Sequence, residues 1–255
     1  MDAKLIEKEI GGGYKHVISL GSFCSPALEI ERLGLRDGSY PFDWVLSRSM
    51  NNVVELISNG FSDLFNVDFF YQWKSQCSTY ENIKCDIVFV HDFSQWIDLN
   101  SQLKHVIDKY QRRINRFYQA IQEKTLFVRY IESESEYKYV EKNYKLILET
   151  LKSYNKENDI LYIVNDDVGC QSNELRNAIM VQKDTNDSVA RKFAEKNLQI
   201  AQILCTAYYS EKKRQSNLIF LRKKRKKEWM RKIRKRLTEY IKKKTETPYL
   251  FERQI

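Results

Sequence analysis

The alternation of apolar, β-branched segments with amphipathic segments constrains the fold of this chain more than any other feature. Five segments have the length and composition of buried strands: residues 16–20, 86–90, 125–131, 159–164 and 178–182. Apolar residues recur at helical spacing between them, most clearly in residues 101–122, 136–154 and 188–209. This order is typical of a parallel sheet buried on both faces. The sequence therefore predicts an α/β protein with a Rossmann-like or flavodoxin-like parallel sheet of about five strands and flanking helices.

The chain has the length of one large domain, with 255 residues of which 42% are hydrophobic. We expect a single α/β domain over residues 1–210, with an insertion at about 36–84, and a basic helical tail over residues 211–255. The insertion is much longer than one crossover helix requires. It carries a Tyr-Pro-Phe-Asp-Trp element at 40–44, a helix near 49–59 and aromatic residues at 69–73. It is either a lid or substrate wall, or additional core packing.

The positive charge of the chain is concentrated in the tail. Residues 222–244 hold 14 Lys or Arg against 2 Glu, a local charge of +12, so the rest of the chain carries −3 of the total of +9. Trp229, Ile233, Leu237 and Tyr240 with Ile241 form a narrow apolar stripe at helical spacing. A basic amphipathic helix is typical of an anionic membrane surface, with nucleic acid as the competing partner. A solvated helix without a partner is the third interpretation.

Several classes of protein are disfavoured by composition. No apolar run approaches the roughly 18 residues of a membrane span, and the start of the chain lacks the apolar region of a signal peptide. We therefore expect a cytoplasmic protein, with a peripheral position at the inner membrane face left open by the tail. The five cysteines are widely spaced and contain no Cys-x-x-Cys pair, so we expect reduced thiols, no metal site and no cofactor.

Cys24 follows the first predicted strand and a glycine turn, and it stands directly before a helix that opens on Ser25 and Pro26. A helix N-terminus favours anions and can lower the pKa of a thiol, so Cys24 is a candidate nucleophile. The same loop, residues 21–25, is also a candidate for binding a phosphate or carboxylate through its backbone. A small buried hydrophobic residue is the third possibility.

Ligands of open parallel sheets bind beyond the carboxyl ends of the strands. The predicted strands carry these candidate residues at or near that end: Ser22 and Cys24, His91 and Asp92, Arg129, Asn165 with Asp166 and Asp167, and Lys183. Among the three histidines, His16 opens a strand at the opposite edge and His105 lies within a helix, so His91 is the candidate base.

A thiol needs a base, and an imidazole base needs a group that fixes its tautomer. Cys24 is the predicted nucleophile, His91 its base, and Asn165 or Asp92 the orienting group, with Asp43 as a rival. Backbone N–H groups around residues 24–27 would bind the oxyanion. Substrate contacts are predicted for Ser22, Ser25, Asp43, Trp44 and Arg129. Arg129 either anchors a substrate anion or pairs with a buried acid.

Five short blocks resemble a bacterial family of unknown function that carries the label of papain-like cysteine peptidases. They are Ile-Ser-Leu-Gly-Ser-Phe-Cys at 18–24, Leu-Gly-Leu-Arg at 33–36, Tyr-Pro-Phe-Asp-Trp at 40–44, Phe-Val-His-Asp-Phe at 89–93 and Phe-Val-Arg at 127–129. The resemblance covers roughly residues 15–183 and implies Cys24 as nucleophile and His91 as base. It also implies an association with surface-polysaccharide glycosyltransferases.

The pattern of this chain departs from that label. Papain-like enzymes place the cysteine on a long helix and the histidine on a separate antiparallel barrel, whereas the segments here alternate as strand and helix. The Gly-Ser turn is also similar to that of SGNH esterases, with Ser22 as nucleophile, but their Asp-x-x-His element near the C-terminus is absent.

The leading functional prediction is a cysteine-dependent hydrolase, peptidase-like, or an acyl transferase. One alternative is an enzyme or binding protein of surface-polysaccharide synthesis whose residues 21–25 hold the phosphate of a nucleotide sugar. The other is a non-catalytic module that docks through its basic tail.

Overall fold

The computed structural model describes residues 10–168, 175–181 and 192–245, and it describes side chains up to residue 240. The predictions for Cys170, Lys183, Val189 and residues 246–255 lie outside the described residues.

A four-stranded parallel sheet is the centre of the described structure. Its strands are β1 (His16–Ser19), β6 (Thr125–Ile131), β7 (Asp159–Asn165) and β8 (Ala178–Val181), in the order β1-β6-β7-β8. All seven residues of β6 are buried, as expected for a strand covered on both faces. The predicted α/β class is therefore confirmed, and four of the five predicted strands form this sheet.

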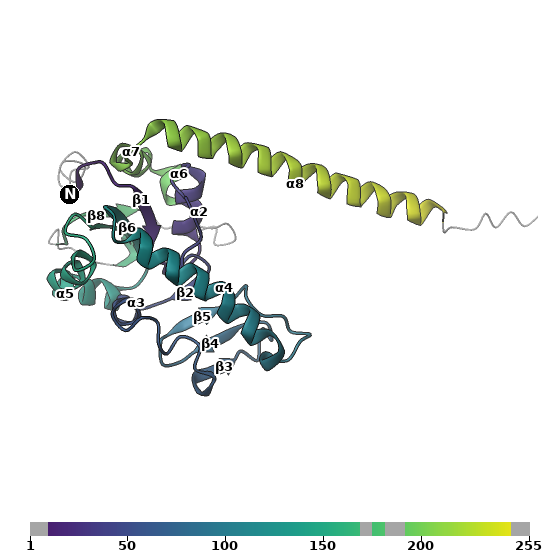
Figure 1. Ribbon diagram of the computed structural model, residues 1–255, viewed down its shortest axis with the longest axis horizontal. Coiled ribbons are helices and arrows are strands. Elements are labelled where there is room, and N and C mark those ends of the chain that lie inside the picture. Colours follow the sequence, from purple (N-terminus) through teal and green to yellow (C-terminus); the bar gives the residue numbers. More distant parts are fainter. Residues whose placement is uncertain (1–9, 169–174, 182–191, 246–255) are drawn as a thin grey trace, which may run out of the picture.

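Helices cover both faces of the parallel sheet (Figure 1). The helices are α2 (Ser25–Arg32), α3 (Met50–Ser58), α4 (Leu99–Ala120), α5 (Glu134–Lys152), α6 (Phe193–Lys196) and α7 (Leu198–Ala207). One face packs against α2, α6 and α7, and the other packs against α3, α4 and α5. Asn197 caps α7 by accepting from the N–H groups of Gln199 and Ile200, which divides the predicted helix 188–209.

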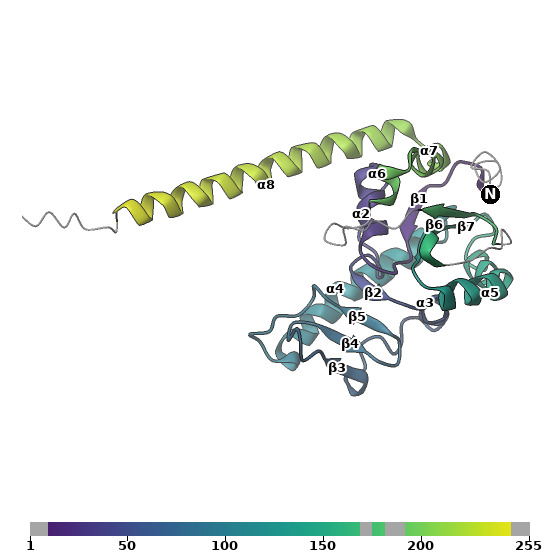
Figure 2. The same cartoon turned by 180° about the vertical axis from the view of Figure 1, so that it is seen from behind.

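The segment predicted as the second parallel strand belongs to another sheet. An antiparallel sheet in the order β2-β5-β4-β3 comprises β2 (Val45–Ser47), β3 (Phe70–Gln72), β4 (Tyr80–Asn82) and β5 (Ile87–Phe89). The prediction placed residues 86–90 in the parallel sheet, and this was wrong. Because Ile87, Val88 and Phe89 are all buried, they have the continuous apolar character of a parallel strand, which periodicity alone does not distinguish. Figure 2 shows this sheet beyond the carboxyl edge of the parallel sheet.

The aromatic residues of the insertion extend the core. Phe61, Phe65 and Phe70 pack with Phe89, Tyr110 and Phe117 at ring-centroid distances of 5.2–6.1 Å. Tyr71 on the edge strand β3 is 49% exposed. Most aromatic rings of the insertion therefore serve as additional core packing, and this is one of the two roles predicted for the insertion.

The last described element is α8 (Glu211–Thr245), a 35-residue helix that projects from the domain. Its first turns contact the loop after α2, since Asn217 Nδ2 donates to the carbonyl of Gly34 (2.9 Å). The predicted basic helical tail thus begins as expected. Among the described helices, none has an apolar stretch long enough to cross a membrane.

Candidate active site

Cys24 is the N-cap residue of α2 and lies at the carboxyl edge of the parallel sheet. Its carbonyl accepts the first helical hydrogen bond, from the Leu28 N–H (3.1 Å), and Pro26 occupies the first turn. The side chain makes no capping bond and is half-buried. The strand, turn and helix predicted around Cys24 are therefore present.

The thiol of Cys24 is less acidic than the helix terminus led us to expect. Burial raises the pKa of Cys24, and a hydrogen bond from its own backbone N–H lowers it by a smaller amount. The expected lowering of the pKa is therefore not found. Because the thiolate is the nucleophilic form, a base has to remove the proton during the reaction.

The turn before Cys24 is held against the second sheet. Gly21 and Ser22 both have positive φ, 83° and 77°. The Gly21 N–H donates to Ser19 Oγ (3.0 Å) and the Ser22 N–H donates to Ser47 Oγ (3.2 Å). A Cβ atom at position 21 would lie 2.5 Å from Ser47 Oγ, so only glycine fits. Two backbone donors of the proposed phosphate loop are thus already occupied.

Arg129 of β6 is fully buried and binds only protein acceptors. Its Nε and Nη2 donate to Glu136 Oε1 (2.8 and 2.5 Å), and its Nη1 donates to the Leu20 carbonyl (2.8 Å). Nη1 also donates to Ser47 Oγ (2.8 Å) and Nη2 to the Ser47 carbonyl (2.6 Å). All five N–H donors therefore have acceptors, and none remains for a substrate anion. Of the two predicted roles, pairing with a buried acid is the one found here.

Asp43 and Trp44 are both tied to Arg36. Asp43 Oδ2 accepts from Arg36 Nη2 (2.7 Å) and from the Tyr40 N–H (2.8 Å). Burial raises the pKa of Asp43, and the charge of Arg36 opposes this. The Arg36 guanidinium lies 4.9 Å from the centre of the Trp44 ring. These contacts fix the loop between α2 and β2.

His91 and Asp92 follow β5 and open the loop to α4. His91 is exposed, and within the described residues it has no hydrogen bond or ion pair. The Asp92 side chain pairs with Lys109 and accepts from the Tyr110 hydroxyl (2.9 Å). In this arrangement Asp92 anchors α4 rather than orienting the imidazole of His91.

Asn165 ends β7 at the same edge of the sheet as Cys24, two strands away in the order β1-β6-β7. It is buried, and its Oδ1 atom has no hydrogen-bond partner among the described groups. Ser22 and Ser25 are also buried, in the turn and in the first turn of α2. Substrate contact by either serine would require this turn to open.

The structure brings some predicted residues together and separates others. The turn at Ser22 contacts Ser47 and through it Arg129, whereas no hydrogen bond among the described residues joins Cys24 to His91. Ser47 pairs with Ile87 in the sheet, and His91 lies four residues further along the chain. The thiol therefore comes from a helix start and the imidazole from the end of an antiparallel strand.

A small cavity that no sequence pattern predicted lies beside Ser47 and the Arg129–Glu136 pair. It has a volume of about 180 Å³ and is lined by Arg48, Ser49, Met50, Ser135, Glu136 and Tyr139. Glu136 is buried, which raises its pKa, while Arg129 and the Met50 N–H oppose the shift. The Ser-x-x-Glu pattern at 133–136 is a helix-start signal that could have located Glu136, and the Glu136 N–H does donate to Ser133 Oγ (3.3 Å).

A cluster of polar side chains that the sequence did not predict lies at the amino edge of the parallel sheet, around His16. His16 Nδ1 bonds Asp37 Oδ2 (2.5 Å), its Nε2 lies 3.4 Å from Glu123 Oε2, and the Tyr40 hydroxyl donates to Asp37 Oδ1 (2.7 Å). Burial lowers the pKa of His16, but the two carboxylates outweigh it and the net shift is upward. His16 opens β1 as predicted, but no local pattern links residues so far apart in sequence.

The described residues contain no group of three or more His, Cys, Asp or Glu side chains arranged to hold a metal ion. Cys24, Cys77, Cys85 and Cys205 are free thiols. Cys205 on α7 is half-buried like Cys24, and burial raises its pKa as well.

Comparison with known proteins places the chain in a family. Residues 15–149 match the family described as "Putative papain-like cysteine peptidase (DUF1796)". The chain belongs to this family. The matched segment contains Cys24, His91 and Arg129, whereas Asn165 lies beyond it.

One relative is itself an uncharacterized protein, so its name suggests no function. An uncharacterized protein of Acanthamoeba polyphaga mimivirus is 30% identical over 120 residues, which are 40% of this chain and 54% of the relative. The chain thus spans about half the length of that relative. No solved structure matches the chain.

Proposed function

We propose that this protein is a cysteine-dependent hydrolase or acyl transferase in which Cys24 is the nucleophile and His91 the base. The observation that carries the proposal is that the thiol and the imidazole come from two different structural elements. The thiol stands at the N-terminus of α2, and the imidazole follows a strand of a separate antiparallel sheet. Papain-like enzymes also divide the two groups between a helix and an antiparallel element, although α2 has only eight residues and the antiparallel element here is a four-stranded sheet rather than a barrel.

The proposed reaction begins when a substrate carbonyl enters beside Cys24. His91 accepts the thiol proton as sulfur bonds to the carbonyl carbon, and the same proton then passes to the leaving group. Water or an acceptor nucleophile attacks the thioester, His91 takes its proton, and the thiol is regenerated. Backbone N–H groups at the start of α2 would stabilise the oxyanion.

The choice of His91 rests on the other two histidines being engaged or remote. His16 is held by two carboxylates at the amino edge of the parallel sheet, and His105 is exposed within α4. His91 opens residues 90–98, the connection between β5 and α4. In this proposal that connection carries the imidazole to Cys24 when substrate binds.

The nucleotide-sugar interpretation has less support. It requires free backbone donors in residues 21–25, and the N–H groups of Gly21 and Ser22 are bonded to Ser19 and Ser47. We therefore favour thiol chemistry at this loop. Arg129 and Glu136 hold the loop in position in either case.

Acyl transfer can be tested with p-nitrophenyl acetate, followed by mass spectrometry of tryptic peptides. We expect acetylation of Cys24 and not of Cys205, which has similar burial and a pKa shifted in the same direction. His91→Ala should reduce the rate of Cys24 acetylation by about 10²-fold or more, in the range of general base catalysis. His105→Ala is the matched control and should leave the rate unchanged. Equal acetylation of Cys24 and Cys205 would contradict the proposal.

A further inference from the structure

The apolar stripe of α8 is exposed although the rest of the helix is strongly basic. Trp229, Leu237 and Tyr240 are 60%, 54% and 59% exposed, and Met230 is 39% exposed. Ile233, between them, is half-buried. Trp229, Ile233, Leu237 and Tyr240 follow one another at intervals of four, four and three residues, so they share one face of the helix, and Met230 lies at the side of that face.

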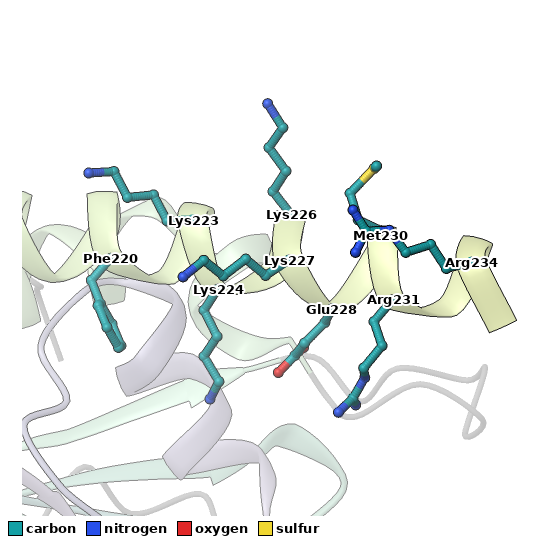
Figure 3. Close-up of a pocket in the computed structure, with 9 residues that line it drawn as sticks. All are labelled: Phe220, Lys223, Lys224, Lys226, Lys227, Glu228, Met230, Arg231 and Arg234. Carbon is teal, nitrogen blue, oxygen red and sulfur yellow. The ribbon is translucent and has the colours of Figure 1, made fainter.

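The stripe faces away from the rest of the protein. In Figure 3, Lys226 points outward, whereas Phe220, Lys224, Glu228 and Arg231 point toward the side on which the domain lies. Trp229, Met230 and Ile233 lie three, four and seven residues after Lys226 and therefore share its outward face. The domain leaves this face open.

Among the α8 side chains that the structure describes up to residue 239, those of the first turns bond to the domain. Arg214 Nη1 donates to the Leu33 carbonyl (3.3 Å), Asn217 binds the Gly34 carbonyl, and a Cβ atom on Gly34 would lie 2.7 Å from Leu218 Cγ. Beyond these turns, the hydrogen bonds and ion pairs of the described α8 side chains up to residue 239 stay within the helix, such as the bond that the Thr238 hydroxyl donates to the Arg234 carbonyl. The anchored start fixes which way the stripe faces.

We propose that α8 lies flat on an anionic lipid bilayer, with its apolar stripe inserted between the headgroups and its Lys and Arg side chains on the lipid phosphates. A helix of this kind buries its apolar face about 5–10 Å into the boundary of headgroups and acyl chains. The +12 charge of residues 222–244 complements the negative surface. The domain, on the other side of α8, is held off the membrane with its predicted active site in water.

The same observations argue against the competing partners. A second copy docked on the stripe would bring two segments of +12 together, which like charges oppose. Nucleic acid binds Lys and Arg through its phosphates and would leave Trp229, Ile233 and Leu237 exposed to water. An anionic bilayer pairs its phosphates with the Lys and Arg side chains and also buries the apolar stripe.

Flotation of the full-length protein with lipid vesicles tests the proposal. Wild-type protein should float with vesicles of phosphatidylserine and phosphatidylcholine, but not with phosphatidylcholine alone. Ile233→Ser with Leu237→Ser should weaken binding by about tenfold or more because it removes apolar burial. Ile233→Phe with Leu237→Phe should restore it. Phe220→Ser is the matched control, since Phe220 is 65% exposed on the opposite side.

The fluorescence of Trp229 gives a second readout. Anionic vesicles should shift the tryptophan emission to the blue, and Trp229→Phe should abolish the shift although Trp44, Trp73 and Trp96 remain. Three outcomes would overturn the proposal. They are equal vesicle binding by the Ile233→Ser, Leu237→Ser variant, a dimer in sedimentation that this variant dissociates, and binding to an RNA duplex without binding to anionic vesicles.

Discussion

The two sheets of this protein are covered differently. The parallel sheet is buried on both faces, with β6 fully enclosed. The antiparallel sheet ends in β3, whose residues Tyr71 and Gln72 are exposed. Two polar junctions join the parallel sheet to the inserted segment: Arg129 with Ser47 at the carboxyl edge, and His16 with Asp37 at the amino edge. The first is fully buried and the second is half-exposed, so they should differ in strength.

The largest effect is expected at the buried junction. Arg129→Met removes five hydrogen bonds and leaves Glu136 buried without its cation, so the free energy of unfolding should fall by about 3–5 kcal/mol. Urea denaturation measures this. Because Arg129 bonds both sheets, hydrogen exchange should accelerate in both. Adding Glu136→Met should recover part of the lost free energy of unfolding. Unchanged hydrogen exchange in either sheet of the Arg129→Met variant would contradict the role of Arg129 in joining the two sheets.

A smaller effect is expected where the turn contacts the second sheet. Gly21→Ala combines an unfavourable positive φ with a Cβ 2.5 Å from Ser47 Oγ, and should cost about 2–4 kcal/mol. Gly60→Ala is the control, since Gly60 also has positive φ but open space around its Cβ; it should cost about 1–2 kcal/mol. Thermal unfolding of the two variants gives the difference. Equal costs would show that the clash with Ser47 relaxes freely.

The half-exposed junction should be weaker and depend on pH. The pKa of His16 is raised in the folded state, so its stabilising contribution is complete below the ordinary histidine value of about 6.5 and is lost as pH rises through the folded value. The pKa of Asp37 is lowered, so its contribution is lost as pH falls through its folded value. His16→Asn should cost about 1–2 kcal/mol at pH 6 and less at pH 9.

Melting temperatures at pH 6 and pH 9 measure this dependence. His105→Asn is the control, because His105 is exposed on α4, and it should change stability by less than about 0.5 kcal/mol at either pH. A constant penalty for His16→Asn between the two pH values would contradict the assigned charge state.

The smallest effect is expected on the edge of the antiparallel sheet. Tyr71→Ala should change the free energy of unfolding by less than about 0.5 kcal/mol because the side chain is half-exposed. Its neighbour Phe70 packs on Phe89 and Phe93, and Phe70→Ala should cost about 2–3 kcal/mol. Chemical denaturation of both variants gives the two free energies of unfolding, and their difference measures how much more one face of the antiparallel sheet is buried than the other. Equal costs would mean that a partner covers the outer face.

The sequence pattern was informative for long elements and uninformative for short ones. The predicted segments 125–131 and 159–164 became β6 and β7 nearly residue for residue, and 101–122 became α4. The strands of the antiparallel sheet have three residues each, too few to show a period, and β5 has the composition of a parallel strand. Length, rather than chemistry, limited what could be predicted.

The candidate site shows the same limit. A Ser-Pro helix start after a glycine turn was sufficient to place Cys24 at the N-terminus of α2. The pKa of its thiol was not predictable, because burial comes from residues that are remote in sequence. The bonds of Arg129 to Ser47, 82 residues away, and of His16 to Asp37 also leave no local pattern.

By itself the sequence determined the α/β class, the helix start at Cys24 and the basic tail, because each depends on residues within one or two turns of chain. Only the tertiary structure decided that residues 86–90 belong to the antiparallel sheet, that Arg129 bonds groups of the protein itself, and that the stripe of α8 faces away from the domain. Those outcomes depend on burial and on partners distant in the chain, which propensity and periodicity do not encode.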